Sequence, residues 1–414
     1  MSIGYASLTV HVRNTTYKTC RMNSCTDNKL RDIITHNLTS LEHTIEYNIK
    51  NDIHLYRISS DLIPFGSSPV NQINWLCEFS EEFKRIAEKI RAGKVRISMH
   101  PGQYTLLNTP NQDILNRSIE DLWYHTRLLE ALGGNQTNKI ILHVGGIYQD
   151  KEEAMKRFIK VYHSLPQAIK NHLVIENDER SYTIFDCLKL HEATGVPVVY
   201  DNLHHALNHD EVKTDAFWIE ACRKTWKVTD GVQKVHYSQQ HPTKQPGAHT
   251  DTIDIKTFEA YYLSLQEIPD IMLEVKDKNL SAIKCINCFE RLPQIKHLEQ
   301  EWSMYKYQVL ATSPRGYQEI RNLLKDKSTY PCIEFYQLLD EALATPPTVK
   351  GNVNTLQHIW GYFKQIATSN EKETFKRLLQ QYINGTISIT RPKTFLIKLT
   401  NQYENAYLQQ STFF

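Results

Sequence analysis

The chain has 414 residues, which is enough for one large domain and a smaller second one. It carries 48 Lys and Arg against 46 Asp and Glu, a net charge of +2, and no stretch approaches the roughly 18 consecutive apolar residues that a membrane helix needs. The N-terminus lacks the charged flank and the cleavage site of a signal peptide, so we expect a cytoplasmic protein with no membrane partner.

Short apolar runs rich in β-branched residues alternate with helical patterns from residue 3 to about residue 296. The runs predict strands over 3–10, 54–58, 95–99, 140–143, 173–176, 196–200, 235–237 and 271–274. Between the first strands, helices are predicted over 27–48, 73–92, 112–132, 151–170 and 181–193. Eight strands, each with a following helix, predict an α/β fold, a closed (β/α)₈ TIM barrel over residues 1–300.

The alternation stops after about residue 300, and only helical patterns remain. They predict helices over 301–311, 317–325, 333–344, 354–367, 371–384 and 393–410. We therefore expect a separate, all-α C-terminal domain over 301–414. Residues 276–414 hold 18 Lys and Arg against 12 Asp and Glu, whereas residues 1–275 are slightly acidic and hold 16 of the 18 His. The eight Cys show no disulfide framework, and Cys285 and Cys288 are expected to be buried or idle thiols in preference to a zinc knuckle or a redox pair.

Residues of metal-ligand type stand at the ends of six predicted strands. They are His100, His143, Glu176, Asp201, His236 and Glu274. In a (β/α)₈ barrel the carboxyl ends of the strands meet at one mouth, where the active site lies, so these six side chains should form a divalent-metal cluster. A mixed His and carboxylate set favours Zn²⁺ or Mn²⁺, although Mg²⁺ is possible with the carboxylates. A cluster of two or three such ions is the usual apparatus for phosphodiester hydrolysis.

Several further residues belong to this interpretation. His204 follows Asp201 by three positions, which lets both side chains turn toward one ion, and His249 lies in the loop after the seventh strand. Lys234 precedes His236 by two positions and should point into the barrel on the same side. Three other histidines lie in helix or loop patterns without such partners and are expected to be non-ligands: His125, His191 and His209.

The loop after the third strand, residues 100–104, places Pro and Gly before Gln103 and Tyr104. An exposed aromatic ring beside an amide on a stiff loop can push between bases and stack on them. The alternative is an ordinary loop with a half-buried tyrosine.

Nine segments in order along the barrel carry a resemblance to the UV-damage endonuclease family, relatives of the xylose-isomerase-like barrels. The segments are 3–5, 55–61, 98–104, 142–146, 175–180, 200–205, 234–238, 249–251 and 273–278. The resemblance implies a DNA repair endonuclease that nicks double-stranded DNA 5′ to cyclobutane dimers and 6-4 photoproducts, and in some members at abasic sites. The C-terminal part resembles a small helical domain of unknown function, for which the alternative is a packing appendage.

The same resemblance implies up to three divalent ions, typically Mn²⁺. The implied ligands are His100, His143, Glu176, Asp201, His204, His236, His249 and Glu274. Glu176, Lys234 and His236 are expected to carry catalysis, with Glu176 bridging two ions and Lys234 at a position that can be carboxylated. Tyr5, Gln103 and Tyr104 are expected to contact the DNA at the lesion.

One position departs from the family pattern. Ser68 stands where the family usually carries a ligand histidine, so one ion should be held more weakly. Two rival functions stay open at this point. A sugar isomerase on the same barrel would use mostly carboxylate ligands and a closed pocket, and a non-enzymatic damage-binding protein would use its metals structurally.

Overall fold

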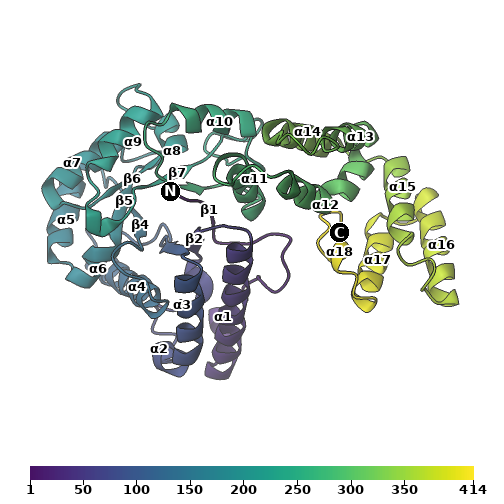
Figure 1. Cartoon of the computed structure of the whole chain (residues 1–414). Helices are drawn as coiled ribbons and strands as arrows, with labels where there is room; N and C mark the ends of the chain where they lie inside the picture. Colours follow the sequence, from purple (N-terminus) through teal and green to yellow (C-terminus); the bar gives the residue numbers. More distant parts are fainter. The chain divides into compact units, whose positions relative to one another are not determined.

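The computed structural model describes residues 1–414 and divides into two compact units (Figure 1). The first comprises residues 1–253 and 257–286, and the second comprises residues 254–256 and 287–414. No helix in either unit has the length and apolar character required to cross a bilayer.

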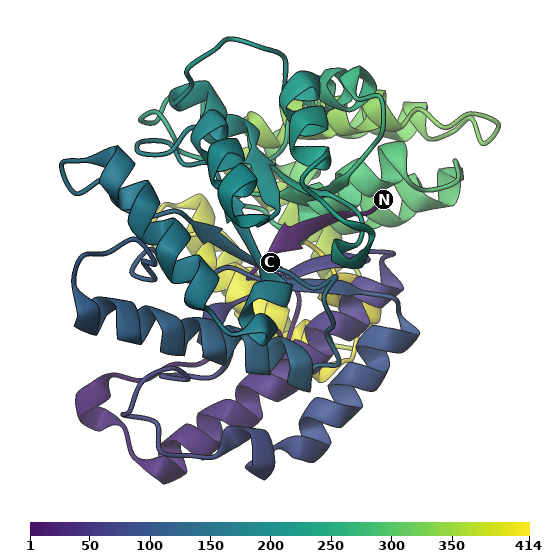
Figure 2. The same cartoon turned by 90° about the vertical axis from the view of Figure 1, so that its left-hand side faces the viewer.

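The first unit is built on a closed barrel of eight parallel strands arranged in chain order. The strands are β1 (Ile3–Ala6), β2 (Leu55–Ile58), β3 (Arg96–Met99), β4 (Ile140–His143), β5 (Leu173–Glu176), β6 (Val198–Asp201), β7 (Lys234–Tyr237) and β8 (Asp270–Leu273). Figure 2 shows β1, in purple, inside the surrounding helices. The predicted TIM barrel is confirmed, and with it the helical character of the chain that follows.

Helices connect the strands and form the outer layer. They are α1 (Asp27–Lys50), α2 (Trp75–Glu78), α3 (Ser80–Ala92), α4 (Gln112–Ala131), α5 (Lys151–Ser164), α6 (Gln167–His172), α7 (Ile184–Thr194), α8 (Asn202–Leu207), α9 (Asp215–Arg223), α10 (Ile255–Ser264) and α11 (Asn279–Phe289). Two predicted helices are each divided. The 73–92 segment breaks at Phe79, which leaves the helical region with φ −113°. The 151–170 segment breaks before Pro166, because proline forces the preceding Leu165 into an extended conformation.

Strand register brings the ends of neighbouring strands to one level. His143 of β4 pairs with Glu176 of β5, and Asp201 of β6 pairs with His236 of β7. Met99 of β3 pairs with Ile140 of β4, so His100 follows directly at the end of its strand. The polar side chains at the carboxyl ends therefore share one rim of the barrel.

Ion pairs occupy the opposite, amino-terminal end of the barrel. Arg96 at the start of β3 contacts Asp270 at the start of β8 at 2.7 Å, and Lys139 contacts Asp230 at 2.6 Å. Lys139 is fully buried, so its charge requires this partner. These pairs close the amino-terminal end with charged groups that are already satisfied.

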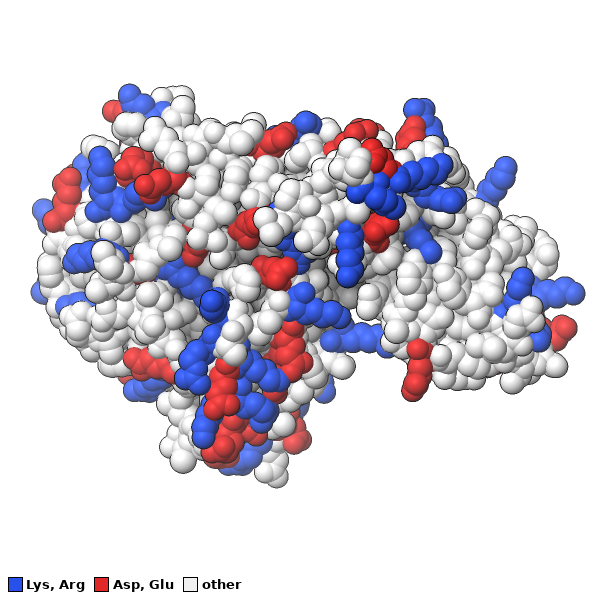
Figure 3. All heavy atoms as spheres, viewed as in Figure 1, with Lys and Arg blue, Asp and Glu red and all other residues white.

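On the outer surface of the barrel, acidic and basic side chains alternate over α1 and α3 (Figure 3). Glu42 of α1 lies 2.9 Å from Arg85 and 2.7 Å from Lys89 of α3. Exposed pairs of this kind contribute about 0–1 kcal/mol each. The surface over these helices is therefore of mixed sign.

The second unit is helical throughout. Its helices are α12 (Ile295–Thr312), α13 (Pro314–Leu323), α14 (Cys332–Ala344), α15 (Val349–Trp360), α16 (Ser369–Ile383), α17 (Thr390–Gln402) and α18 (Ala406–Gln409). They enclose a core of their own that includes Leu356, Phe363 and Leu396. The rings of Trp360 and Phe375 stack with their centroids 4.4 Å apart.

Candidate metal centre

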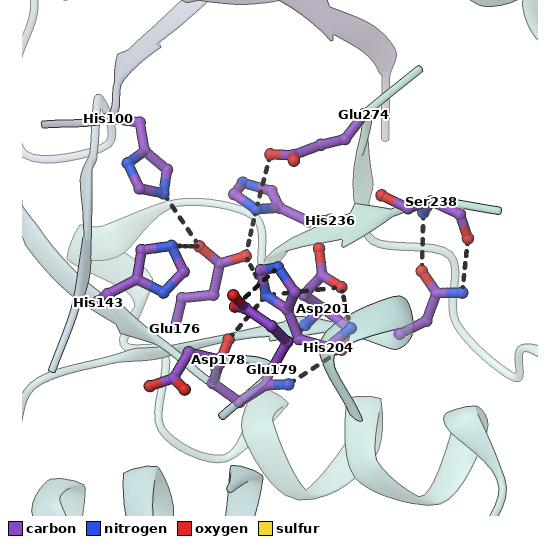
Figure 4. A network of polar contacts seen from close by, with 12 residues as sticks. His100, His143, Glu176, Asp178, Glu179, Asp201, His204, His236, Ser238 and Glu274 are labelled. Carbon is purple, nitrogen blue, oxygen red and sulfur yellow. Dashed lines mark hydrogen bonds and ion pairs between the residues drawn. The ribbon is translucent and has the colours of Figure 1, made fainter. Parts of the chain in front are cut away.

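Glu176, at the end of β5, lies at the centre of the strand-end cluster and is almost completely buried. Its Oε2 lies 3.2 Å from Nε2 of His100 and 3.7 Å from Nε2 of His143. Its Oε1 accepts a hydrogen bond from Nδ1 of His236 at 2.6 Å and lies 3.8 Å from Nδ1 of His204. Figure 4 shows the two pairs of imidazoles on opposite sides of this carboxylate. Each carboxylate oxygen therefore faces a separate group of ligand atoms.

Asp201 and His204 are held in place by the backbone around them. Oδ1 of Asp201 accepts from the backbone N–H of His204 at 2.8 Å, which starts α8. Asn177 binds both backbone groups of Asp201, with its side-chain oxygen 2.9 Å from the Asp201 nitrogen and its amide 3.0 Å from the Asp201 carbonyl. The Asn177 backbone carbonyl faces Nδ1 of His204 at 3.0 Å, so Nδ1 donates, and Nε2 is the nitrogen that can bind a cation once it loses its proton. His100 is oriented in the same way, with Nδ1 at 2.9 Å from the Pro101 carbonyl.

Glu274 follows β8 and closes the cluster on the other side. Its Oε1 lies 3.4 Å from Nδ1 of His236, and its Oε2 lies 3.9 Å from Nε2 of His249. Arg57 of β2 forms a short ion pair with the same carboxylate. This guanidinium supplies positive charge next to the buried Glu274 carboxylate.

The cluster has the electrostatics of a cation site. Burial opposes ionisation of Glu176 and Glu274, but the neighbouring histidines and Arg57 outweigh it and hold the pKa of both carboxyls below the usual range. Burial also raises the pKa of Asp201 to about 6, against the pull of His204. For His204, burial is outweighed by Asp201 and Glu176, and its pKa rises to about 9. A proton therefore resides on His204 near neutral pH.

His143 and His249 behave in the opposite way. Burial lowers the pKa of His143 to about 4, despite the adjacent Glu176. Burial lowers the pKa of His249 as well. Both imidazoles are neutral near pH 7, which is the form that binds metal ions.

Two groups of ligand atoms converge closely enough to hold an ion each. The first contains His100, His143 and Glu176, and the second contains Glu176, Asp201 and His236, with all ligand atoms of a group within 4.8 Å of one another. Oδ2 of Asp201 and Nε2 of His236 are buried and have no hydrogen-bond partner in the protein. Buried polar atoms are normally paired, so these orphaned atoms fit residues built to hold cations. Glu176 is common to both groups.

The cluster opens into a polar cavity of about 300 Å³. Six of the expected ligands line it: His100, His143, Glu176, His204, His249 and Glu274. Asp201 and His236 are fully buried beside it. The structure thus brings all eight expected ligands to one end of the barrel.

Lys234 is placed differently from these ligands. It begins β7 two residues before His236, is fully buried, and does not line the cavity. Its Nζ has no hydrogen-bond partner, and burial lowers its pKa far below the usual range. The predicted catalytic role of Lys234 stays a prediction.

The residues expected to contact DNA fall into two classes. Gln103 and Tyr104 are exposed in the loop after β3, with 66% of Tyr104 accessible. Tyr5 is fully buried, and its hydroxyl binds Thr9 and Asn48 at 2.7 and 2.8 Å. Tyr5 is not accessible in this structure, and its predicted contact with DNA stays a prediction. Both faces of a parallel barrel strand are covered, and all four residues of β1 are buried.

Ser68 lies in the loop between β2 and α2 and does not line the cavity. Its Oγ accepts a hydrogen bond from the backbone N–H of Val70 at 3.3 Å. In this conformation the loop supplies no ligand from position 68, and whether a histidine there would reach the cluster stays a prediction.

The three histidines expected to be non-ligands form hydrogen bonds elsewhere. Nδ1 of His191 faces the Val196 carbonyl at 2.9 Å, and Nδ1 of His209 faces the His205 carbonyl at 3.1 Å. His125 is buried, and its Nε2 lies 2.8 Å from Oγ of Ser60.

Sequence reasoning missed the partners that position the ligands. Ser60 donates to the His100 carbonyl at 2.9 Å and links His125 to the metal cluster. Asn177 and Arg57 were also missed as positioning residues. Arg57 offered one signal, because it is a charged residue inside a predicted strand, where burial demands a partner.

Comparisons with known proteins agree with this geometry. Residues 1–306 match the family described as UV-endonuclease UvdE, and residues 306–414 match a family described as a protein of unknown function (DUF1722). A UV DNA damage endonuclease of Clostridium perfringens (strain 13 / Type A) is 37% identical over 409 residues, which cover 98% of this chain and 97% of the relative. The match to this relative therefore spans both structural units of the chain.

Two further proteins match the barrel. A UV DNA damage endonuclease of Bacillus thuringiensis subsp. konkukian (strain 97-27) is 32% identical over 275 residues, 66% of this chain and 86% of the relative. The crystal structure of SacUVDE is 36% identical with a TM-score of 0.67, and the match covers 70% of this chain and 100% of that chain. The chain belongs to the UV-endonuclease UvdE family.

Proposed function

We propose that the chain is a DNA repair endonuclease that nicks the phosphodiester bond 5′ to UV photoproducts, both cyclobutane dimers and 6-4 photoproducts. Abasic sites are a further proposed substrate. The position of Glu176 between two groups of ligand atoms is the observation that supports this function most directly. A carboxylate shared by two cation sites can hold two ions close together, and hydrolysis of a phosphate ester by paired ions requires such closeness.

The proposed cofactor is Mn²⁺, with two to three ions and with Zn²⁺ or Mg²⁺ as alternatives. The mixed set of five histidines and three carboxylates suits Mn²⁺ or Zn²⁺, and the family resemblance favours Mn²⁺. His100, His143 and Glu176 would hold one ion, and Glu176, Asp201 and His236 a second. His204, His249 and Glu274 are the proposed ligands of the remaining position. Bound ions would polarise the scissile phosphate and lower the pKa of a coordinated water.

The chain's own residues perform the rest of the proposed reaction. Asn177 and Pro101 fix His204 and His100 through their Nδ1 atoms, so each ring presents Nε2 to the cavity. Glu176 and Glu274, which stay ionised, would supply the negative charge that holds cations close together. Gln103 and Tyr104 reach toward the duplex from the loop after β3 and probe its stacking.

Lys234 has a separate proposed role. Its buried amine is held in the neutral form, which is the form that can add carbon dioxide and release one proton to solvent to give a carbamate. A carboxylated Lys234 would bring one more negative charge to the base of the cluster. The intact mass of the protein measures this directly.

The experiment that tests the proposed function uses UV-irradiated supercoiled plasmid. With Mn²⁺ the chain should convert irradiated plasmid to the nicked form, and EDTA should prevent this. Unirradiated plasmid is the matched control. A labelled duplex with one dimer then maps the cut, which should lie immediately 5′ to the lesion and leave a 3′-hydroxyl and a 5′-phosphate. Equal nicking of both plasmids, or none with Mn²⁺ bound, would contradict the proposal.

A further inference from the structure

Two neighbouring loops at the carboxyl end of the barrel share one local design. After β3 the chain reads Gly102-Gln103-Tyr104, and after β4 it reads Gly146-Ile147-Tyr148. In each loop the tyrosine ring lies against the glycine two residues before it. A Cβ added at Gly102 would lie 2.4 Å from the Tyr104 ring, and one at Gly146 would lie 3.2 Å from the Tyr148 ring.

Each loop also presents an exposed pair of side chains. Gln103 and Tyr104 are exposed in the first loop. In the second, Ile147 is 43% and Tyr148 is 37% exposed, although large apolar residues are usually covered. The second loop therefore offers an apolar and an aromatic side chain where the first offers an amide and an aromatic one.

Both loops leave the metal cluster side by side. They begin just after His100 and His143, whose ring centroids are 5.0 Å apart and whose strands pair in the barrel. In Figure 4 these two histidines approach Glu176 from the same side. Both loops therefore begin on the same side of the cluster.

Asn108 ties the second loop to the first. Its side-chain amide donates to the Gly146 carbonyl at 2.8 Å and to the Tyr182 hydroxyl at 3.0 Å. Gly145 has φ +118°, and a Cβ there would lie 2.3 Å from Oδ1 of Asn108. Only glycine fits this backbone conformation and this close approach. The hydrogen bond from Asn108 therefore fixes the second loop to the first.

Tyr148 is itself held against the scaffold. The guanidinium of Arg157 lies 5.5 Å from the ring centroid, and Nε of Arg157 donates to the Asn108 carbonyl at 2.9 Å. Tyr148 and Gln149 have φ of 49° and 71°, which non-glycine residues rarely adopt. Backbone strain of this kind persists only where the surroundings enforce it, and it is concentrated at functional sites.

We propose that Ile147 and Tyr148 form a second DNA probe, in which the Tyr148 ring stacks on a nucleobase of the damaged duplex and Ile147 wedges beside it. This inference rests on the proposed function and adds a binding element to the same site. The occupant is a base of the duplex that Tyr104 contacts, because Asn108 holds the two loops together and both begin at metal ligands. A planar ring with an apolar neighbour suits the face of a base.

The test compares variants of the full chain. Tyr148→Leu keeps apolar bulk but removes the ring, Tyr148→Phe keeps the ring, and Ile147→Ala removes the wedge. Val228→Ala is the matched control, since Val228 is 98% exposed in the turn η3 (Val228–Asp230), which precedes β7 at the other end of the barrel. Fluorescence anisotropy in EDTA measures binding to a duplex with a single thymine dimer and to its undamaged counterpart. Single-turnover nicking with Mn²⁺ is measured at increasing enzyme concentration. The half-saturating enzyme concentration reports DNA binding, and the limiting rate reports the cleavage step.

Stacking on one base corresponds to a change in affinity of roughly tenfold. We expect Tyr148→Leu to weaken binding of the damaged duplex by about this factor and to raise the half-saturating concentration in parallel. Ile147→Ala should weaken binding less, and Tyr148→Phe and Val228→Ala should match wild type. Metal content should be unchanged, because neither residue is among the expected metal ligands.

The outcomes separate the two proposals. Wild-type protein that neither prefers nor nicks the damaged duplex would overturn the proposed function itself. Wild-type preference that persists unchanged in Tyr148→Leu would overturn the second probe alone. An equal loss in Tyr148→Leu and Tyr148→Phe would also overturn it, because the effect would then come from the hydroxyl or the loop and not from stacking.

Discussion

Metal binding to this protein should depend steeply on pH, because His204 carries a proton that a cation must replace. Asp201 and Glu176 outweigh the effect of burial and raise the pKa of His204 to about 9. The protonated imidazole has no lone pair for a metal, so binding is suppressed below this pKa and recovers as the pH rises through it. The pKa of Asp201, about 6, adds a second competing proton only below about pH 6.

The size of the effect follows from the two values. Below about pH 9 the proton on His204 competes with the cation, and this proton alone should make the apparent affinity rise about tenfold per pH unit. At pH 7, about two units below the pKa of His204, competition costs about a hundredfold, or about 2.7 kcal/mol. Binding at this pH should release about one proton from His204.

Calorimetric titration with Mn²⁺ at pH 6.5, 7 and 8 measures this linkage. Pairs of buffers with different ionisation enthalpies give the number of protons released. His204→Ala should bind more weakly, with a flat dependence on pH in this window. His143→Ala is the matched control: it removes a ligand whose pKa is about 4, so affinity should fall while the slope stays. A flat profile in wild type, or an unchanged slope in His204→Ala, would refute the reasoning.

Three further predictions address the cluster and the loop after β3. Glu176→Gln should reduce nicking below about a tenth of the wild-type rate while DNA binding persists, since a neutral amide cannot ligate an ion in both groups. A nicking rate above that threshold would show that Glu176 does not bridge two ions. Gln103→Ala combined with Tyr104→Ala should weaken the preference for irradiated over undamaged duplex by roughly 1–3 kcal/mol per lost stacking contact, with unchanged metal content; a preserved preference would exclude the wedge. Ser68→His should retain more metal on dialysis, by elemental analysis, and need less added Mn²⁺ for full nicking, whereas Ser68→Ala should match wild type. If Ser68→His changes neither the retained metal nor the Mn²⁺ concentration needed for full nicking, position 68 is not a vacated ligand position.

Much of the architecture followed from local patterns. The eight strands were predicted because each is a short apolar run bounded by polar or glycine-rich segments, and their carboxyl ends must meet in a parallel barrel. The helix boundaries were less accurate. The break before Pro166 carried a recognisable signal, because proline restricts the residue that precedes it, whereas no proline or glycine marks the break at Phe79.

The sequence by itself determined the fold class and the side-chain types at the mouth, because strand periodicity and strand ends are local properties. Only the tertiary structure decided which ligands share Glu176, since His100 and His236 lie 76 and 60 residues away along the chain and meet it through barrel register. Tertiary packing also buried Tyr5, paired Arg57 with Glu274, and joined two loops through Asn108. Such contacts depend on distances across the barrel, which no local pattern encodes.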